Sequence, residues 1–104
     1  MSLKKALIII PTYNEAENIK PLILRIINTS LEVKGYTADI LVVDDFSPDG
    51  TGSIVKKLEQ EHRNIHILSG NKVGLGKAYI RGLKYGLEKQ VYDAFIIDGC
   101  RLLP

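Results

Sequence analysis

The fold is decided by an apolar run that passes at once into polar residues, Ala6-Leu7-Ile8-Ile9-Ile10-Pro11-Thr12-Tyr13-Asn14-Glu15. Five apolar residues without alternation are typical of a strand that is covered on both faces, as in a parallel sheet. Residues 39–43 and 94–97 have the same continuous character, and residues 64–68 form a fourth short run. The sequence therefore predicts four strands.

Apolar residues at helical spacing separate these runs. The three stripes are Ile19, Leu22, Ile23, Ile26 and Ile27; Ile54, Val55 and Leu58; and Ile80, Leu83 and Leu87. Pro21 belongs in the first turn of the first helix, where its missing N–H costs little. Residues 28–37 are predicted to form a long loop into the second strand.

Strands that alternate with helices predict an α/β fold, in which right-handed crossovers build a Rossmann-like parallel sheet with helices on both faces. We expect a single domain over residues 1–104. Ligands of such sheets bind beyond the carboxyl ends of the strands. The candidate site is therefore made of residues 11–15, residues 44–50 and the residues after Ile97.

Composition excludes several classes of protein. With 45% hydrophobic and 25% charged residues in 104, the chain is neither disordered nor collagen-like nor a multidomain enzyme. No apolar run approaches the roughly 20 residues of a membrane span, and we expect a soluble, cytoplasmic chain. The net charge of +2 comes from interspersed charges without a basic stripe, so no nucleic-acid partner is expected.

The turns after the strands lack the usual glycine motifs for nucleotides. The first strand ends in Pro11-Thr12-Tyr13, where a dinucleotide-binding domain needs a glycine-rich turn. Gly74-Leu75-Gly76 follows the third strand without the remaining residues of a Rossmann fingerprint or a P-loop. Two interpretations stay open for this region: a tight turn with close helix packing at Gly82 and Gly86, or close approach to a phosphate.

Asp44 and Asp45 are adjacent carboxylates at the end of a buried strand, where they need donors or a cation nearby. Because side chains alternate along a strand, one of the two is expected to face the cleft and the other to be held by local backbone donors. A cleft carboxylate can accept N–H groups from the edge of guanine or uracil. The plainer interpretation is an Asx-type cap on the following turn, which is favoured more for Asp44 than for Asp45.

Three segments together resemble a known family. They are Ile8-Ile9-Ile10-Pro11-Thr12-Tyr13-Asn14-Glu15 with Glu17-Asn18-Ile19, Leu41-Val42-Val43-Asp44-Asp45-Phe46-Ser47-Pro48-Asp49-Gly50-Thr51, and Gly74-Leu75-Gly76-Lys77-Ala78-Tyr79-Ile80-Arg81-Gly82. They resemble inverting family 2 glycosyltransferases of GT-A fold, and more narrowly the dolichol-phosphate or polyprenol-phosphate mannosyltransferase branch. The resemblance covers nearly the whole chain and implies the N-terminal, nucleotide-binding half of a GT-A domain.

The resemblance also implies roles for single residues. It places Pro11, Tyr13 and Glu15 in a nucleotide-sugar pocket, with Tyr13 against the base or ribose, and lets Val43 and Asp45 complete the base site. Without the resemblance, Tyr13 is better explained as a half-buried packing aromatic and Glu15 as a charge at a helix N-terminus.

Two basic residues beyond these have an open role. Lys77 or Arg81 either faces a diphosphate or belongs to a solvated helix face, and the solvated face is favoured.

The end of the chain departs from the family. In the family the fourth strand ends in Asp-x-Asp, whose carboxylates hold Mg²⁺ or Mn²⁺. Here Asp98 is the first candidate metal ligand, but Cys100 stands where the second carboxylate belongs. Residues from about 98 onward are interpreted as a frame-shifted tail of a truncated domain, because a one-nucleotide shift of suitable codons restores Met-Asp-Ala-Asp-Phe-Ser.

The resemblance implies transfer of a hexose, mannose first, from a nucleotide sugar such as GDP-mannose to polyprenyl phosphate, at a cytoplasmic site or peripherally at a membrane surface. The truncated chain is expected to keep the nucleotide-binding half with little or no activity. An exposed face predicts a homo-oligomer or a domain swap. The alternatives are a non-catalytic nucleotide-binding fragment and, less favoured, a receiver-like signalling module.

Overall fold

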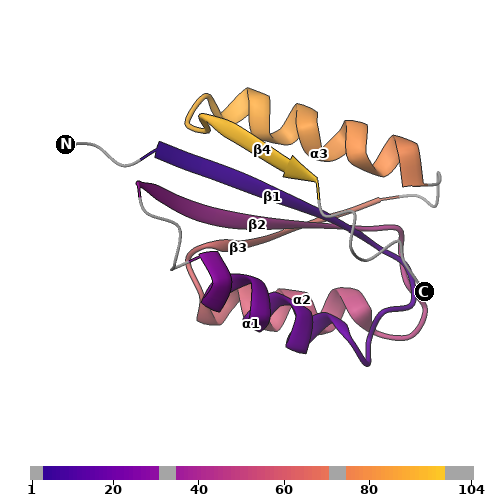
Figure 1. The fold of residues 1–104 in the computed structure, drawn as a ribbon. Coiled ribbons are helices and arrows are strands. Elements are labelled where there is room, and N and C mark those ends of the chain that lie inside the picture. The colour runs from indigo at the N-terminus through magenta and orange to yellow at the C-terminus, as the bar shows by residue number, and fades with distance from the viewer. Residues whose placement is uncertain (1–3, 31–34, 71–74, 98–104) are drawn as a thin grey trace.

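The computed structural model describes residues 4–30, 35–70 and 75–97. Four strands form one parallel sheet in the order β3-β2-β1-β4, with α1 and α2 on one face and α3 on the other (Figure 1). This arrangement confirms the predicted Rossmann-like α/β fold. Along the chain the elements are β1 (Lys4–Thr12), α1 (Ile19–Ser30), β2 (Tyr36–Asp44), α2 (Thr51–Glu61), β3 (Ile65–Ser69), α3 (Leu75–Lys89) and β4 (Ala94–Ile97).

The predicted loop over residues 28–37 is wrong at both ends. Residues 28–30 continue α1, and Tyr36 already pairs with Lys4 of β1. Lys4 N also donates to Gly35 O at 2.9 Å. Backbone hydrogen bonds extend the ladder into exposed positions, whereas apolar periodicity detects only the buried part of a strand.

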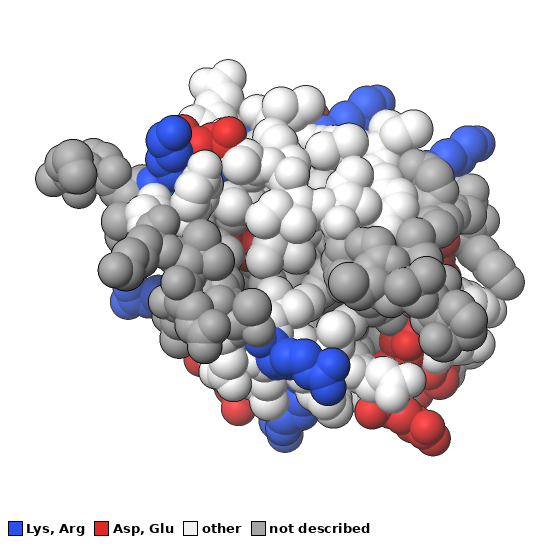
Figure 2. All heavy atoms as spheres, in the orientation of Figure 1, with Lys and Arg blue, Asp and Glu red and all other residues white. Residues whose placement is uncertain are grey.

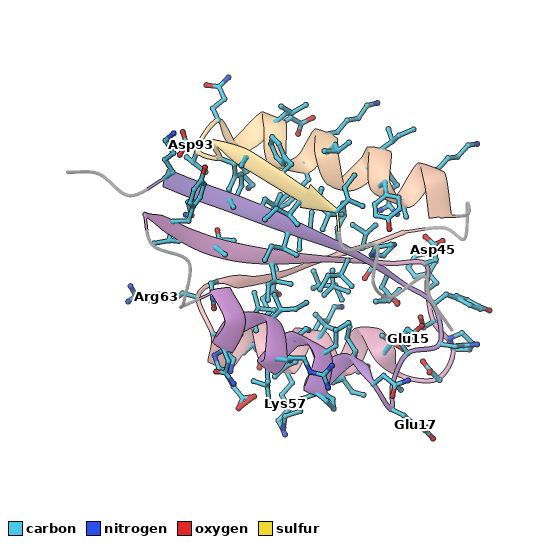
Figure 3. The ribbon with its side chains drawn as sticks, viewed as in Figure 1. Glu15, Glu17, Asp45, Lys57, Arg63 and Asp93 are labelled. Carbon is cyan, nitrogen blue, oxygen red and sulfur yellow. The ribbon has the colours of Figure 1, made fainter. Side chains whose placement is uncertain are left out.

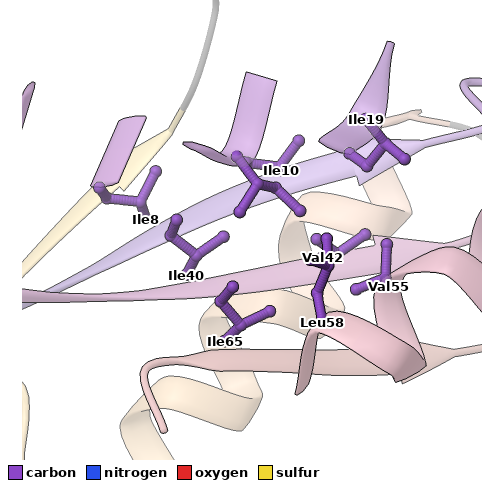
Figure 4. Packing of buried hydrophobic residues seen from close by; sticks show 9 residues of the cluster. Ile8, Ile10, Ile19, Ile40, Val42, Val55, Leu58 and Ile65 are labelled. Carbon is purple, nitrogen blue, oxygen red and sulfur yellow. The ribbon is translucent and has the colours of Figure 1, made fainter. Parts of the chain in front are cut away.

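Alternate residues along the strands point to opposite faces of the sheet, and helices cover both faces. One face carries Ile8, Ile10, Ile40, Val42 and Ile65, which pack with Ile19 and Ile23 of α1 and Val55 and Leu58 of α2 (Figure 4). The other face carries Leu7, Ile9, Leu41 and Val43, which pack with Ala78 of α3. Each fully buried aliphatic side chain contributes about 1.5–3 kcal/mol. A one-residue slip would exchange the two faces, so packing fixes the strand ends in register.

Glycine lets α3 approach the sheet closely. A Cβ atom at Gly82 would lie 2.7 Å from Cγ2 of Ile9 and 3.2 Å from Cγ2 of Val43, and one at Gly86 would lie 2.7 Å from Cδ2 of Leu7. Real side-chain atoms do not come so close, so only glycine fits at these positions without a shift. Close helix packing, one of the two interpretations drawn from the sequence, is confirmed for both glycines.

Candidate functional site

β1 and β2 end side by side at one edge of the sheet. Their pairing sets Pro11 opposite Val43 and Thr12 opposite Asp44, and Asp45 N donates to Thr12 O at 3.2 Å. The segments that follow both strands therefore leave from the same edge. This is the edge at which parallel α/β sheets bind ligands.

The two loops after these strands are fastened to each other. Three backbone N–H groups of the first loop donate to side chains of the second loop or of the first residue of α2. Asn14 N donates to Ser47 Oγ at 2.9 Å, Ala16 N to Asp49 Oδ2 at 3.0 Å, and Glu15 N to Thr51 Oγ1 of α2 at 3.0 Å. Asn14 and Phe46 have φ angles of +56° and +51°, in the left-handed region. Asparagine visits that region readily, whereas it costs Phe46 about 1–2 kcal/mol, which the hydrogen bonds of the two loops offset.

Asp44 is the buried centre of this fastening and is 2% exposed. Its Oδ1 accepts from Thr12 Oγ1 at 2.7 Å and from Ser47 Oγ at 2.6 Å, and its Oδ2 accepts from Ser47 N at 3.0 Å. The carboxylate thus joins the last residue of β1 to the turn after β2. Of the two interpretations drawn from the sequence, the loop-capping one describes Asp44.

Asp45 has a different environment. Its side chain is 9% exposed, and Oδ1 accepts no hydrogen bond within the described part of the chain. The nearest cation is Arg81 of α3, whose Nη1 lies 4.0 Å from this oxygen. The sequence favoured a solvated helix face for Arg81, because arginine side chains are mostly exposed. Helical spacing does not show which strand end such a long side chain reaches. A buried carboxylate oxygen that lacks a hydrogen-bond partner is rare in folded proteins and marks a candidate binding group.

The remaining predicted site residues also lie at this edge, and some of them are buried whereas others are exposed. Pro11 and Val43 are buried in β1 and β2, Tyr13 is 39% exposed in the loop after β1, and Glu15 is half-buried. Figure 3 shows Asp45 and Glu15 at the same end of the sheet, with Asp93 at the opposite end. The structure thus brings the five residues to one edge, where Pro11 and Val43 are buried and Tyr13 is exposed.

Asp49 stabilises the second loop through its charge. A hydrogen bond from the Thr51 hydroxyl, with further bonds from the backbone N–H groups of Ala16 and Thr51, lowers the pKa of the Asp49 carboxyl below its usual value. A lowered pKa in the folded state means that the ionised group stabilises the fold at pH above the unfolded value of about 3.9. The contribution is lost as the pH falls through the folded pKa.

We therefore expect Asp49→Asn to lower the melting temperature by a few degrees at pH 7. The difference from the wild type should shrink as the pH falls below about 4, because the wild-type carboxyl becomes protonated as the pH passes through its lowered pKa. Thermal unfolding followed by circular dichroism at several pH values measures this. Glu61→Gln, which neutralises an exposed carboxylate at the other end of α2, is the matched control. A difference between wild type and Asp49→Asn that does not depend on pH would contradict the assignment.

Acidic side chains gather around the candidate site. Figure 2 shows them at the end of the molecule where Figure 1 places the carboxyl ends of β1 and β2, and Figure 3 labels Glu15 and Glu17 there. These carboxylates disfavour a negatively charged ligand at this edge, where Arg81 is the cation next to Asp45.

The described residues contain no group of three His, Cys, Asp or Glu side chains placed to hold a metal ion. Asp98, the metal ligand expected from the sequence, and the residues from about 98 onward that we interpret as a frame-shifted tail lie outside the described residues. The structure therefore gives no set of ligands into which a divalent cation can be fitted. None of the helices in the described ranges is long and apolar enough to cross a membrane.

Comparison with known proteins gives consistent matches. The family described as Glycosyl transferase family 2 matches residues 7–95. An undecaprenyl-phosphate mannosyltransferase of Micrococcus luteus is 43% identical over 93 residues, and a polyprenol monophosphomannose synthase of Mycolicibacterium smegmatis is 40% identical over 88 residues. Among solved structures, a mannosyltransferase from Pyrobaculum calidifontis in complex with GDP-Man and Mn²⁺ is similar, with 26% identity and a TM-score of 0.52.

The coverage of these matches is unequal. The matches to the Micrococcus and Mycolicibacterium relatives cover 88% and 83% of this chain but only 36% and 31% of the relatives' own length. The match to the solved structure covers 82% of this chain and 25% of the chain in that structure. The chain thus spans about a third of the length of the curated relatives. The resemblance drawn from its sequence motifs is confirmed over most of the chain.

Proposed function

Since the chain belongs to glycosyltransferase family 2, we propose that it binds a nucleotide sugar, with GDP-mannose as the first candidate, at the carboxyl ends of β1 and β2. The observation that carries the proposal is Asp45, a buried carboxylate whose Oδ1 lacks a hydrogen-bond partner among the described residues, at the strand end where such sheets bind ligands. The similar mannosyltransferase solved with GDP-Man supports this choice of ligand.

Each residue has a part in the proposed complex. Asp45 accepts N–H groups from the base, and Tyr13 stacks on the base or the ribose. Pro11 and Val43, buried at the ends of β1 and β2, form the floor, and Glu15 borders the pocket from a loop that Thr51 holds in place. The fastened loops keep these groups in position before the ligand arrives, which reduces the entropy lost on binding.

The larger proposal concerns the reaction. The names of the two relatives support transfer of mannose to a polyprenyl phosphate. The nucleotide sugar as donor and inversion at the anomeric carbon are what the resemblance of the sequence motifs implies. An acceptor phosphate is already ionised, so little help from a general base is needed and positioning of the donor carries much of the rate enhancement. A lipid acceptor supports a peripheral position at a membrane surface.

A divalent cation, Mg²⁺ or Mn²⁺, is part of the proposal for the whole protein. The similar solved structure contains Mn²⁺, and a cation would offset the acidic side chains at this end of the molecule when a diphosphate binds. When bound, such an ion neutralises the diphosphate as it leaves. The described residues supply no ligand set for it, so we assign no ligand to it.

Self-association is a further element of the proposal. β4 lies at the edge of the sheet, and Ile96 and Ile97 on it are 49% and 46% exposed. Apolar side chains on an edge strand favour pairing with a second copy, as a homo-oligomer or by strand exchange.

Calorimetric titration with GDP and GDP-mannose tests nucleotide binding. We expect Tyr13→Ala to weaken binding by about tenfold to a hundredfold, because loss of stacking costs about 1–3 kcal/mol per base. Tyr36→Ala is a closely matched control: Tyr36 is 38% exposed, against 39% for Tyr13, and begins β2 at the opposite end of the sheet. If neither nucleotide binds, or if both variants bind like the wild type, the proposal is wrong.

Transfer of radiolabelled mannose to polyprenyl phosphate separates an enzyme from a nucleotide-binding protein without turnover. If the chain binds the nucleotide and also transfers mannose, it is an enzyme. If it binds the nucleotide without transfer, the alternative of a non-catalytic nucleotide-binding fragment is supported.

A further inference from the structure

The facing atoms of Asp45 and Arg81 form an unusual pair. Oδ1 of Asp45 and Nη1 of Arg81 are 4.0 Å apart, which is too far for a hydrogen bond. Both atoms are shielded from solvent, and neither has a hydrogen-bond partner in the described part of the chain. An acceptor and a donor are thus left unsatisfied side by side at the candidate site, an arrangement that native proteins mostly avoid away from functional sites.

The fold places Arg81 at this point by close packing. Gly82, the next residue, brings α3 against Ile9 and Val43 of the sheet. The Arg81 guanidinium itself lies directly over Gly70, and any side chain at position 70 would collide with it. The Gly70 N–H is fixed to Asp44 O at 3.0 Å, so the backbone beneath the guanidinium is held by β2.

The two partners differ in how easily they move. Asp45 is 7% exposed, and its backbone N–H is bound to Thr12 at the end of β1. Arg81 has a long side chain that is 29% exposed, and its Nη2 donates to Ser69 O at 3.0 Å in an exposed hydrogen bond. Side chains at binding sites commonly change rotamer when a ligand binds. A ligand can therefore enter between the two groups by moving Arg81 while Asp45 stays in place.

A carboxylate beside a guanidinium distinguishes between bases. In a ring held in one orientation, guanine and uracil place a C=O where adenine and cytosine place an amino group. Guanine and uracil also carry an N–H beside that C=O, where the other two bases carry a lone pair. The N–H matches Asp45 and the C=O matches Arg81, whereas adenine or cytosine would set an amino group against the guanidinium.

We propose that Arg81 is a specificity-determining residue of the nucleotide site, which with Asp45 selects bases that carry a C=O beside a ring N–H. This inference rests on the proposed nucleotide binding. It adds to that proposal a donor from α3, and it gives the class of base that the site accepts: guanine or uracil, and not adenine or cytosine.

Calorimetric titration of the chain with GDP, UDP, ADP and CDP tests the inference. We expect the wild type to bind GDP or UDP at least about tenfold more tightly than ADP and CDP, as expected for a good base contact. Arg81→Met should reduce this preference by about tenfold, and Arg81→Lys should keep part of it, because lysine retains the charge but not the planar fork. Lys84→Met, the same kind of change at an exposed position one turn along α3, should leave the preference unchanged.

The outcomes separate this inference from the proposal on which it rests. If the wild type prefers GDP or UDP and both Arg81 variants keep the full preference, or if the wild type binds all four nucleotides equally, the inference is overturned and nucleotide binding stands. If the wild type binds none of the four, both are overturned. Circular dichroism of each variant confirms that it is folded. If Arg81→Met binds too weakly for a ratio to be measured, the ratio for Arg81→Lys decides.

Discussion

Replacing Asp44 with alanine is expected to lower the free energy of unfolding by about 3–4 kcal/mol. The carboxylate accepts three hydrogen bonds at a position that is 2% exposed, from the Thr12 hydroxyl and from the backbone and hydroxyl of Ser47. Without it, donors at the end of β1 and in the turn after β2 lose their partner. Each unsatisfied buried donor costs about 1–3 kcal/mol. Urea denaturation measures the loss.

The same substitution should weaken nucleotide binding even in chains that stay folded. Ser47, which Asp44 holds, accepts the N–H of Asn14 next to Tyr13, so the loss releases both loops at once. Asp44→Asn keeps the shape and one acceptor and is expected to cost about 1–2 kcal/mol. Asp93→Ala is the control, because that carboxylate accepts the N–H of Lys5 at an exposed position far from the site. A loss below about 0.5 kcal/mol for Asp44→Ala would contradict this role.

The sequence was sufficient to predict the fold because a parallel sheet buried on both faces leaves continuous apolar runs. It also predicted that the candidate residues after β1 and β2 gather at one edge of the sheet, since the two parallel strands end in register. The ends of elements were less predictable. Residues 28–30 and 36–37 belong to a helix and a strand because of backbone pairing, which no apolar pattern records.

The different roles of Asp44 and Asp45 could be predicted only in part from the sequence. Alternation along a strand shows that two adjacent carboxylates point apart, and local turn chemistry favoured Asp44 as the cap. The signal for Asp44 was the turn that follows it directly, and the structure shows that the donors come from Ser47, three residues further on. The contact between Asp45 and Arg81 joins residues 36 positions apart and depends on how closely α3 packs, which one sequence does not show.

Gly82 controls that packing, and Gly82→Val is expected to lower the free energy of unfolding by about 2–3 kcal/mol. A Cβ there meets Cγ2 of Ile9 at 2.7 Å and Cγ2 of Val43 at 3.2 Å. Both atoms branch directly from Cβ in the central strands, so they cannot turn aside as the end of a long side chain can. The gain in helix propensity from replacing glycine, below about 1 kcal/mol, does not offset the collision. Urea denaturation gives the value.

Repeating Gly82→Val in a chain that carries a second substitution shows whether the collision with Ile9 causes the loss of stability. In a chain that carries Ile9→Ala, Cγ2 of Ile9 is absent, so Gly82→Val should cost at least about 1 kcal/mol less than in the wild type. The collision also acts on the site: a shift of α3 away from β1 and β2 moves Arg81 away from Asp45, so Gly82→Val should reduce the preference for GDP or UDP over ADP and CDP. Lys84→Val, at an exposed position on α3, should change neither quantity. Additive costs in the two backgrounds would show that Gly82 is needed for another reason than close approach to Ile9.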